Sequence, residues 1–218
     1  APPLTRPTPG QVRVETWRTN WGTMDLSLLG PHQAHNAAIA LASLDLLAEV
    51  DPRLAVSRDA AAQGLGTLRW PARVEILGEN PCLIVDGAHN VASAEALAET
   101  LRTSFPTTLR TLVFGTTREK DMRGQLQALL PLFDVVIATR YVENPRSVPA
   151  EEVAQTVREI DGRDATIAPD PAAALDLARR LTPPSGIICV TGSLFLAAEA
   201  RALLLEKENV SPRAGVVT

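Results

Sequence analysis

The chain has 218 residues, of which 45% are hydrophobic, and its formal net charge at pH 7 is −4. This composition predicts one or two folded domains, and no apolar stretch is long enough to span a bilayer. The charge gives no reason to expect nucleic acid as a partner. Cys82 and Cys189 fall in predicted buried strands, which favours reduced thiols in a cytoplasmic protein, although a disulfide stays open.

The first third of the chain has a different pattern from the rest. Alternating polarity predicts two strands that pair as a hairpin through a turn at Asn20-Trp21-Gly22, and Gly30-Pro31 ends the second strand. The spacing of apolar residues then indicates helices. The predicted elements are strands at 12–17 and 22–28, helices at 32–50 and 57–65, and, after a junction at 66–72, a strand at 73–77.

Short apolar runs alternate with helical patterns through the remaining chain. Near-continuous apolar strands of this kind are typical of a parallel sheet with helices on both faces. The sequence therefore predicts an α/β, Rossmann-like fold with a mostly parallel sheet. The expected strands are 82–85, 111–114, 135–138 and 187–190, and the expected helices are 93–101, 121–131, 149–160, 170–182 and 193–206.

Polar side chains follow the first of these strands. Asp86, His89 and Asn90 come directly after the apolar run 82–85, and Ser93 could cap the helix that follows. In an open α/β sheet, ligands gather outside the carboxyl ends of the strands. The segment therefore predicts a ligand site, although an ordinary turn after the strand would explain part of the pattern.

Five motifs occur in order along the chain. They are Gly30-Pro31-His32-Gln33-Ala34-His35-Asn36, Trp70-Pro71-Ala72-Arg73-Val74-Glu75, Asp86-Gly87-Ala88-His89-Asn90, Glu119-Lys120-Asp121 and Thr191-Gly192-Ser193. With this order and spacing, the chain resembles the folylpolyglutamate synthase and dihydrofolate synthase branch of the Mur ligase superfamily, from about residue 10 to 206. The resemblance implies that residues 1–68 are a hairpin-plus-helices remnant of that family's central ATPase domain. Residues 69–218 would then be its carboxyl-terminal domain.

The resemblance also implies a reaction. These ligases transfer the γ-phosphate of ATP to a substrate carboxylate, and the amine of an amino acid then attacks the acyl phosphate. The implied small-molecule partners are ATP, glutamate and a folate, with Mg²⁺ as the metal. The phosphates and Mg²⁺ are held largely by the family's central domain, so we expect no metal ligand in this chain.

Particular residues take roles by the same analogy. Asn36 would hydrogen-bond the adenine, Arg73 would approach the phosphates and Asp86 would accept from the ribose hydroxyls. The catalytic candidates are His89, which would also lie near the nucleotide, and Lys120, and Ser193 would contact the glutamate. Each also has a structural alternative. Arg73 could pair with Glu75 or Asp86, and Lys120 could be a solvated charge at a helix start. Ser193 could have no role other than capping a helix.

Some features depart from the family pattern. Ala72 stands where glycine is usual and Val91 where proline is common, and no Gly-x-x-x-x-Gly-Lys-Ser/Thr phosphate loop occurs. We therefore expect a piece of a longer ligase, with that ligase's ATPase domain as its partner and no activity alone. A stand-alone binding module for a nucleotide or acidic ligand is the alternative. Among enzymes, the nearest alternative is a peptidoglycan-type ligase. Its substrate-binding stretch resembles Asn144-Pro145-Arg146-Ser147, but a loop before a helix explains these residues equally well.

Overall fold

The structure is a computed structural model that describes residue 7 and residues 10–106 and 109–210. The chain separates into two compact units. The hairpin unit is made mainly of Arg6–Pro71, and the sheet unit mainly of Ala72–Ala98 and Pro106–Thr218. Within the described ranges, no helix has the length and apolar character that crossing a membrane requires.

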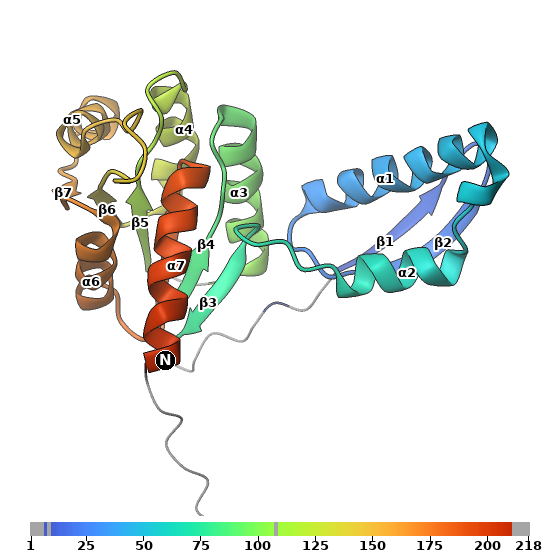
Figure 1. The fold of residues 1–218 in the computed structure, drawn as a ribbon. Helices are drawn as coiled ribbons and strands as arrows, with labels where there is room; N and C mark the ends of the chain where they lie inside the picture. The colour runs from blue at the N-terminus through green and yellow to red at the C-terminus, as the bar shows by residue number, and fades with distance from the viewer. Residues whose placement is uncertain (1–6, 8–9, 107–108, 211–218) are drawn as a thin grey trace, which may run out of the picture. The chain divides into compact units, whose positions relative to one another are not determined.

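The hairpin unit has the predicted order of elements (Figure 1). Its antiparallel strands share a core with the helices because the inward-facing side chains of the hairpin, such as Val12, Trp21 and Met24, are apolar and buried against Leu41. The elements are β1 (Gly10–Glu15), β2 (Asn20–Leu26), α1 (Pro31–Val50), the short 3-10 helix η1 (Pro52–Leu54) and α2 (Arg58–Thr67).

The predicted turn of the hairpin is wrong by a few residues. Asn20-Trp21-Gly22 belongs to β2, and the chain reverses over residues 16–19. There the Thr16 amide donates to the Thr19 carbonyl at 3.1 Å, and the Thr16 hydroxyl accepts from the Thr19 amide at 3.0 Å. The turn is therefore closed by two threonines rather than by an Asn-Gly type turn.

Asp45 on α1 fixes this turn. Its side chain is 3% exposed and accepts hydrogen bonds from the Thr16 hydroxyl, from the Thr19 hydroxyl at 2.7 Å and from the Trp21 indole at 3.0 Å. Burial acts to raise the pKa of Asp45, but these three donors and nearby Arg18 outweigh burial and leave the pKa below its ordinary value of 3.8. The buried carboxylate is thus charged and fully paired.

The sheet unit contains a six-stranded sheet in the order β3-β4-β8-β5-β6-β7. Strand β3 runs antiparallel to β4, and the other neighbours are parallel, so the sheet is mostly parallel as predicted. The sequence pattern did not predict β7, which is only two exposed residues long. The strands are β3 (Glu75–Glu79), β4 (Cys82–Val85), β5 (Arg110–Phe114), β6 (Val135–Ala138), β7 (Thr166–Ile167) and β8 (Ile187–Thr191).

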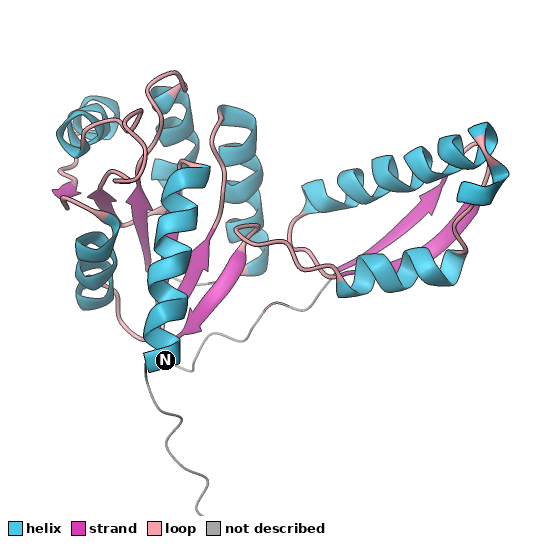
Figure 2. Cartoon of the chain, in the orientation of Figure 1, coloured by secondary structure: helices cyan, strands magenta, loops and turns pink. Residues whose placement is uncertain are grey.

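Helices cover both faces of this sheet (Figures 1 and 2). From β4 through β5 and β6 to β7 the chain proceeds toward one edge of the sheet, and it then returns to place β8 between β4 and β5. Because the crossovers are right-handed, the helices before and after this reversal lie on opposite faces. The first face carries α3 (Val91–Ser104), α4 (Met122–Leu129), the 3-10 helix η2 (Leu130–Leu132) and α5 (Ala150–Asp161), and the second carries α6 (Pro171–Leu181) and α7 (Leu194–Val210).

The core of the sheet unit follows from strand alternation. One side of the central strands packs with α6 and α7 through Leu83 and Val85 of β4 and Ile188 and Val190 of β8. The side chains between these residues point to the other face of the sheet. All five residues of β8 are buried, as a central parallel strand requires. This core holds the carboxyl ends of β4, β8 and β5 next to one another.

Candidate functional site

The candidate site lies at the carboxyl ends of three neighbouring strands. Val85 of β4 is level with Val190 of β8, and Thr191 of β8 is level with Phe114 of β5. The loops that leave these strands therefore meet at one edge of the sheet. Strand β8 lies between β4 and β5 but follows both in the sequence. This edge is therefore a point where the strand order reverses, and ligand sites of open α/β sheets usually lie at such points.

These loops line a hollow of about 440 Å³. It brings together His89, Lys120 and Ser193, three residues that the sequence nominated separately. Lys120 is exposed and Ser193 is 1% exposed, so the hollow offers an exposed cation and a buried hydroxyl. The complete lining is His89, Thr117, Glu119, Lys120, Arg146, Ser193, Leu194 and Phe195.

Helix N-termini add to the positive character of this edge. Helix α4 begins at Met122, after Lys120 and the capping residue Asp121, and helix α7 begins at Leu194, directly after Ser193. Free backbone N–H groups and the helix dipole favour anions at such positions. The Ser193 hydroxyl also accepts from the Phe195 amide at 3.2 Å, so Ser193 takes part in helix capping, the alternative role expected for it. The arrangement suits phosphate or carboxylate groups.

His89 is held in one orientation by its own loop. Its Nδ1 lies 3.0 Å from the Gly87 carbonyl oxygen, which can only accept, so in the neutral ring Nδ1 carries the hydrogen and Nε2 the lone pair. Buried Gln125 on α4 donates to the His89 carbonyl at 3.5 Å and to the Thr116 hydroxyl at 3.3 Å. A neutral His89 can therefore accept a proton or a hydrogen bond at Nε2.

The cap of α3 differs from the prediction. The helix begins at Val91, and Asn90 is the capping residue because its Oδ1 accepts from the Ser93 amide at 2.9 Å. Ser93 lies inside the first turn and returns the interaction, its hydroxyl accepting from the Asn90 amide at 3.1 Å. Asn90 therefore shapes the end of the His89 loop.

Asp86 is buried beneath a strained turn. Its carboxylate is 6% exposed and accepts from the Val74 amide at 2.9 Å and the Ala88 amide at 2.8 Å. Ala72 and Val74 have φ values of 54° and 47°, a left-handed conformation that non-glycine residues rarely adopt. Such strain persists where the surroundings impose it, and it concentrates at functional sites. Exposed Arg73 stands between these two residues.

Glu75 contacts both the strained turn and α7. Its carboxylate accepts from Arg201 Nε on α7, at 2.8 and 3.1 Å, and from the Ala72 amide at 2.8 Å. The hydrogen bond with Glu75, outweighing burial, raises the pKa of Arg201. Glu75 thus fixes the strained turn to α7.

Arg146 is a lining residue that the predicted site omitted. Its loop folds back on the loop after β5 through a bridge between Thr117 and Ser147, and the Arg118 amide donates to the Arg146 carbonyl at 3.0 Å. The guanidinium lies over the Phe195 ring, 5.7 Å from its centroid, and Phe195 in turn packs against Tyr141 at 5.3 Å. The one sequence pattern that pointed to Arg146 as a site residue is the Asn144-Pro145-Arg146-Ser147 stretch.

Asn36 belongs to the hairpin unit. It lies on the first turns of α1, where its Nδ2 donates to Gln33 Oε1 at 3.0 Å and its side chain is exposed. The expected contact between Asn36 and an adenine stays a prediction.

The two cysteines are free and buried in neighbouring strands. Burial first, and then the charges of Asp86 and Cys82, raise the pKa of the Cys189 thiol well above its ordinary value. Cys189 is therefore a neutral core residue beneath the site and not a nucleophile. Among the residues that the structure describes, no three His, Cys, Asp or Glu side chains are grouped to hold a metal ion.

The fold is that of an α/β domain with a hollow at the carboxyl edge of a mostly parallel sheet. The family described as "Mur ligase, glutamate ligase domain" matches residues 72–194 of the chain. The chain therefore belongs to the Mur ligase superfamily, in the branch of the folylpolyglutamate and dihydrofolate synthases.

Its relatives support this placement. The dihydrofolate synthase/folylpolyglutamate synthase of Mycobacterium tuberculosis is 35% identical over 82% of this chain and 39% of its own length. The solved Mycobacterium tuberculosis folylpolyglutamate synthase complexed with ADP has a TM-score of 0.77 and 32% identity over 84% of this chain and 43% of that one. A bifunctional synthase of Yersinia pestis with AMPPNP and a Mn ion has a TM-score of 0.62 and 28% identity over 73% and 37%. The chain thus spans about two fifths of these relatives.

Proposed function

We propose that this chain forms one side of the active site of an ATP-dependent ligase that joins L-glutamate to a folate. The observation that carries the proposal is the hollow in which His89, Lys120 and Ser193 meet at the starts of α4 and α7. Its cations, hydroxyl and helix N-termini suit the phosphates and carboxylates of this reaction. Relatives named for the reaction, and solved with ADP or AMPPNP, support the assignment.

The reaction proceeds in two steps. A carboxylate oxygen of the folate attacks the γ-phosphorus of ATP, the bond from that phosphorus to the β–γ bridging oxygen breaks, and ADP leaves as the acyl phosphate forms. The glutamate amine then attacks the acyl carbon, an amide bond forms, and inorganic phosphate leaves with the C–O bond pair while the amine loses a proton. Charge builds on phosphoryl oxygens in both steps, so fixed cations and N–H groups lower the barriers.

Three residues serve the nucleotide. Asn36 reads the adenine edge with one donor and one acceptor, and Arg73 approaches the phosphates from its strained turn. Asp86, whose carboxylate is oriented by the Val74 and Ala88 amides, also accepts from the ribose hydroxyls, because each carboxylate oxygen has two lone pairs. Asp86 therefore combines a structural and a binding role.

Three residues serve the reacting groups. His89 offers Nε2 as an acceptor near the transferred phosphoryl group, and Lys120 neutralises charge that develops on it. Ser193, fixed by its position before α7, contacts the incoming glutamate. Both His89 and Lys120 are thus the catalytic residues of the proposal.

The remaining parts of the site belong to another segment of the ligase. Residues 1–68 are the end of its central ATPase domain and residues 69–218 its carboxyl-terminal domain. That ATPase domain supplies the phosphate loop and the ligands of Mg²⁺, so no residue of this chain is assigned to the metal and the chain alone is inactive.

The reduced, buried cysteines support a cytoplasmic location.

A chimera tests the proposal. The part of the Mycobacterium tuberculosis relative that matches this chain is replaced by the chain, and ATP- and folate-dependent incorporation of labelled glutamate is measured. The chimera is expected to be active, its Lys120→Ala variant to lose at least about a hundredfold in kcat/KM, and the chain alone to be inactive.

The controls separate failure of folding from failure of the proposal. Glu151→Gln, an exposed change on α5, should leave the chimera's activity unchanged. A chimera that folds and binds ADP but incorporates no glutamate would contradict the reaction. Nucleotide binding by the chain alone, without activity in the chimera, would favour the stand-alone binding module.

A further inference from the structure

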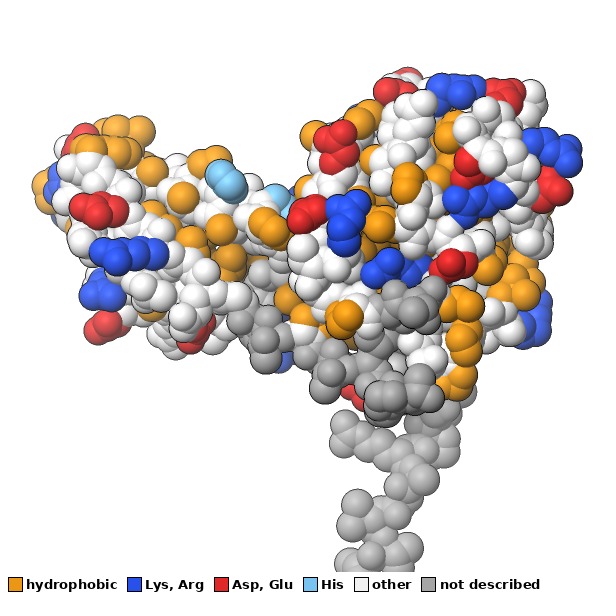
Figure 3. Space-filling view, turned by 180° about the vertical axis from the view of Figure 1, so that it is seen from behind, with side chains coloured by type: hydrophobic (Ala, Val, Ile, Leu, Met, Phe, Trp, Pro, Cys, Tyr) orange, Lys and Arg blue, Asp and Glu red, His pale blue; other side chains and the backbone are white. Residues whose placement is uncertain are grey.

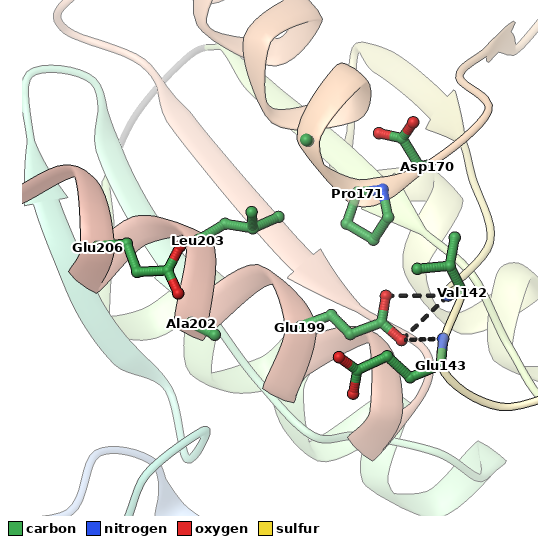
Figure 4. Close-up of a pocket in the computed structure, with 9 residues that line it drawn as sticks. Val142, Glu143, Asp170, Pro171, Glu199, Ala202, Leu203 and Glu206 are labelled. Carbon is green, nitrogen blue, oxygen red and sulfur yellow. Dashed lines mark hydrogen bonds between the residues drawn. The ribbon is translucent and has the colours of Figure 1, made fainter.

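A second hollow, of about 360 Å³, opens on the face of the sheet that α6 and α7 cover (Figure 4). We call it the acidic groove. Three segments form it: the loop after β6, the start of α6 and the outer side of α7 from Glu199 to Glu206. Its lining residues are Val142, Glu143, Asp170, Pro171, Ala172, Glu199, Ala202, Leu203 and Glu206.

Every charged residue that the structure describes in the lining of the groove is acidic. Glu199 accepts from the amides of Val142 and Glu143 at 2.9–3.0 Å, as the dashed lines in Figure 4 show, and Asp170 accepts from the Ala173 amide at 2.8 Å. These two carboxylates are therefore held in place by backbone donors. They form a fixed negative wall that does not depend on any ligand.

The other two carboxylates are not used by the fold. Among the described residues, the side chains of Glu143 and Glu206 have no ion-pair or hydrogen-bond partner. The Arg140 Nε donates to the Pro169 carbonyl at 3.4 Å, next to Asp170, but Arg140 does not line the groove. Four like charges around one hollow repel one another, and a bound cation relieves that repulsion.

The floor of the groove is apolar. Val142, Pro171, Ala172, Ala202 and Leu203 supply it, and Leu203 also packs on the buried core beneath. An apolar floor provides no ligand to a bare metal ion and no hydrogen bond to a small hydrated cation. It matches the aliphatic stems of arginine and lysine, whose charged ends can reach carboxylates at the rim.

We infer that the acidic groove docks a basic segment of a partner protein. The stems of its arginine or lysine side chains lie on the apolar floor, and their cations face Glu143 and Glu206, with Glu199 and Asp170 behind them. Charge complementarity selects this occupant over an acidic or purely apolar one. The inference concerns a surface apart from the ligase hollow and does not rest on the proposed reaction.

Binding of a fluorescein-labelled Arg-Leu-Arg-Leu-Arg peptide to the purified chain, followed by fluorescence anisotropy, tests this inference. A peptide with citrulline in place of each arginine keeps the shape and removes the charge. The arginine peptide should bind and the citrulline peptide should not. Glu143→Gln/Glu206→Gln should weaken binding at least about tenfold, because it removes the two free carboxylates.

Two variants separate the groove from the charge of the whole chain. Glu95→Gln/Glu151→Gln removes two exposed carboxylates elsewhere and should leave the affinity unchanged. Ala202→Trp fills the floor without altering charge and should also abolish binding, with circular dichroism reporting that α7 remains folded. Any of three results would overturn the inference. The first is that Glu143→Gln/Glu206→Gln and Glu95→Gln/Glu151→Gln weaken peptide binding equally, and the second is that Ala202→Trp leaves binding unaltered. The third is that an equal concentration of spermidine displaces the peptide.

Discussion

The Asp86 carboxylate and the Val74 amide are joined by a 2.9 Å hydrogen bond that ties the end of β4 to the left-handed turn before β3. The other carboxylate oxygen accepts from Ala88 at 2.8 Å, and the Gly87 amide donates to the Ala72 carbonyl at 2.8 Å. One buried acid thus holds two loops of the candidate site together. The predicted nucleotide-binding roles of Asp86 and Arg73 are therefore coupled, since the conformation that presents Arg73 depends on Asp86.

Asp86→Ala should destabilise the sheet unit strongly. The change leaves two buried amides without acceptors, and we expect the free energy of unfolding to fall by about 3 kcal/mol. Asp86→Asn keeps one acceptor and should cost less, about 1–2 kcal/mol. Urea denaturation followed by circular dichroism measures both. Asp164→Asn, at an exposed ion pair, is the control and should cost less than about 0.5 kcal/mol.

Ala72→Gly should be neutral or slightly stabilising. An alanine at a φ of 54° costs about 1 kcal/mol, and glycine removes this cost while adding a similar entropy to the unfolded chain. Ala198→Gly, in the interior of α7, is the matched control and should cost about 1 kcal/mol. If both glycine variants lose the same stability in denaturation, Ala72 is not strained.

The hairpin unit should lose stability in acid through Asp45. Because the folded pKa of Asp45 lies below 3.8, its carboxylate contributes fully above that pH, and the contribution is lost as the pH falls through the folded pKa. Asp45→Ala should remove about 3 kcal/mol at pH 7 and abolish this part of the acid dependence. Fluorescence of Trp21, which is 2% exposed, reports the unfolding. Exposed Asp59→Asn should leave the acid dependence as it is.

The Cys189 thiol should be unreactive in the folded protein. Burial and the charge of Asp86 raise its pKa, so at pH 8 the thiolate that attacks disulfide reagents is scarce and inaccessible. We expect Cys82→Ser protein, with Cys189 as its one thiol, to react with Ellman's reagent at least about tenfold more slowly when folded than in guanidinium chloride. Equal rates would show that the strand is not protected.

Local signals in the sequence predicted most elements of the fold. The buried strands are short apolar runs, and helices such as α4 and α6 begin at acidic capping residues, Asp121 and Asp170. The turn of the hairpin was placed wrongly because the contact that fixes it comes from Asp45, remote in sequence. The insertion of β8 between β4 and β5 is likewise set by packing of the whole sheet and has no local signal.

The residues of the candidate site were identified one by one, not as a surface. His89, Lys120 and Ser193 each lie in a loop after a strand, and the family resemblance implied their roles, which stay predictions. Arg146 joins them only because its loop bridges back to Thr117, a pairing that no local pattern announces. The acidic groove has the same character, since it is assembled from three separate segments.

The outer side of α1 should make the purified chain self-associate. This helix is apolar on nearly every side, and beyond the face that packs on the hairpin it exposes Ile39, Leu46, Leu47 and Val50, with exposed fractions from 46% to 77%. Hydrophobic side chains are correspondingly exposed over the hairpin unit in Figure 3. A contiguous apolar patch of this kind favours association in water. Sedimentation of the chain should therefore show mass increasing with concentration, and Ile39→Lys/Val50→Glu should shift it toward the monomer. The matched variant Gln11→Lys/Thr23→Glu changes the polar side of the hairpin and should leave association unaltered; a concentration-independent monomer for the unmodified chain would contradict the prediction.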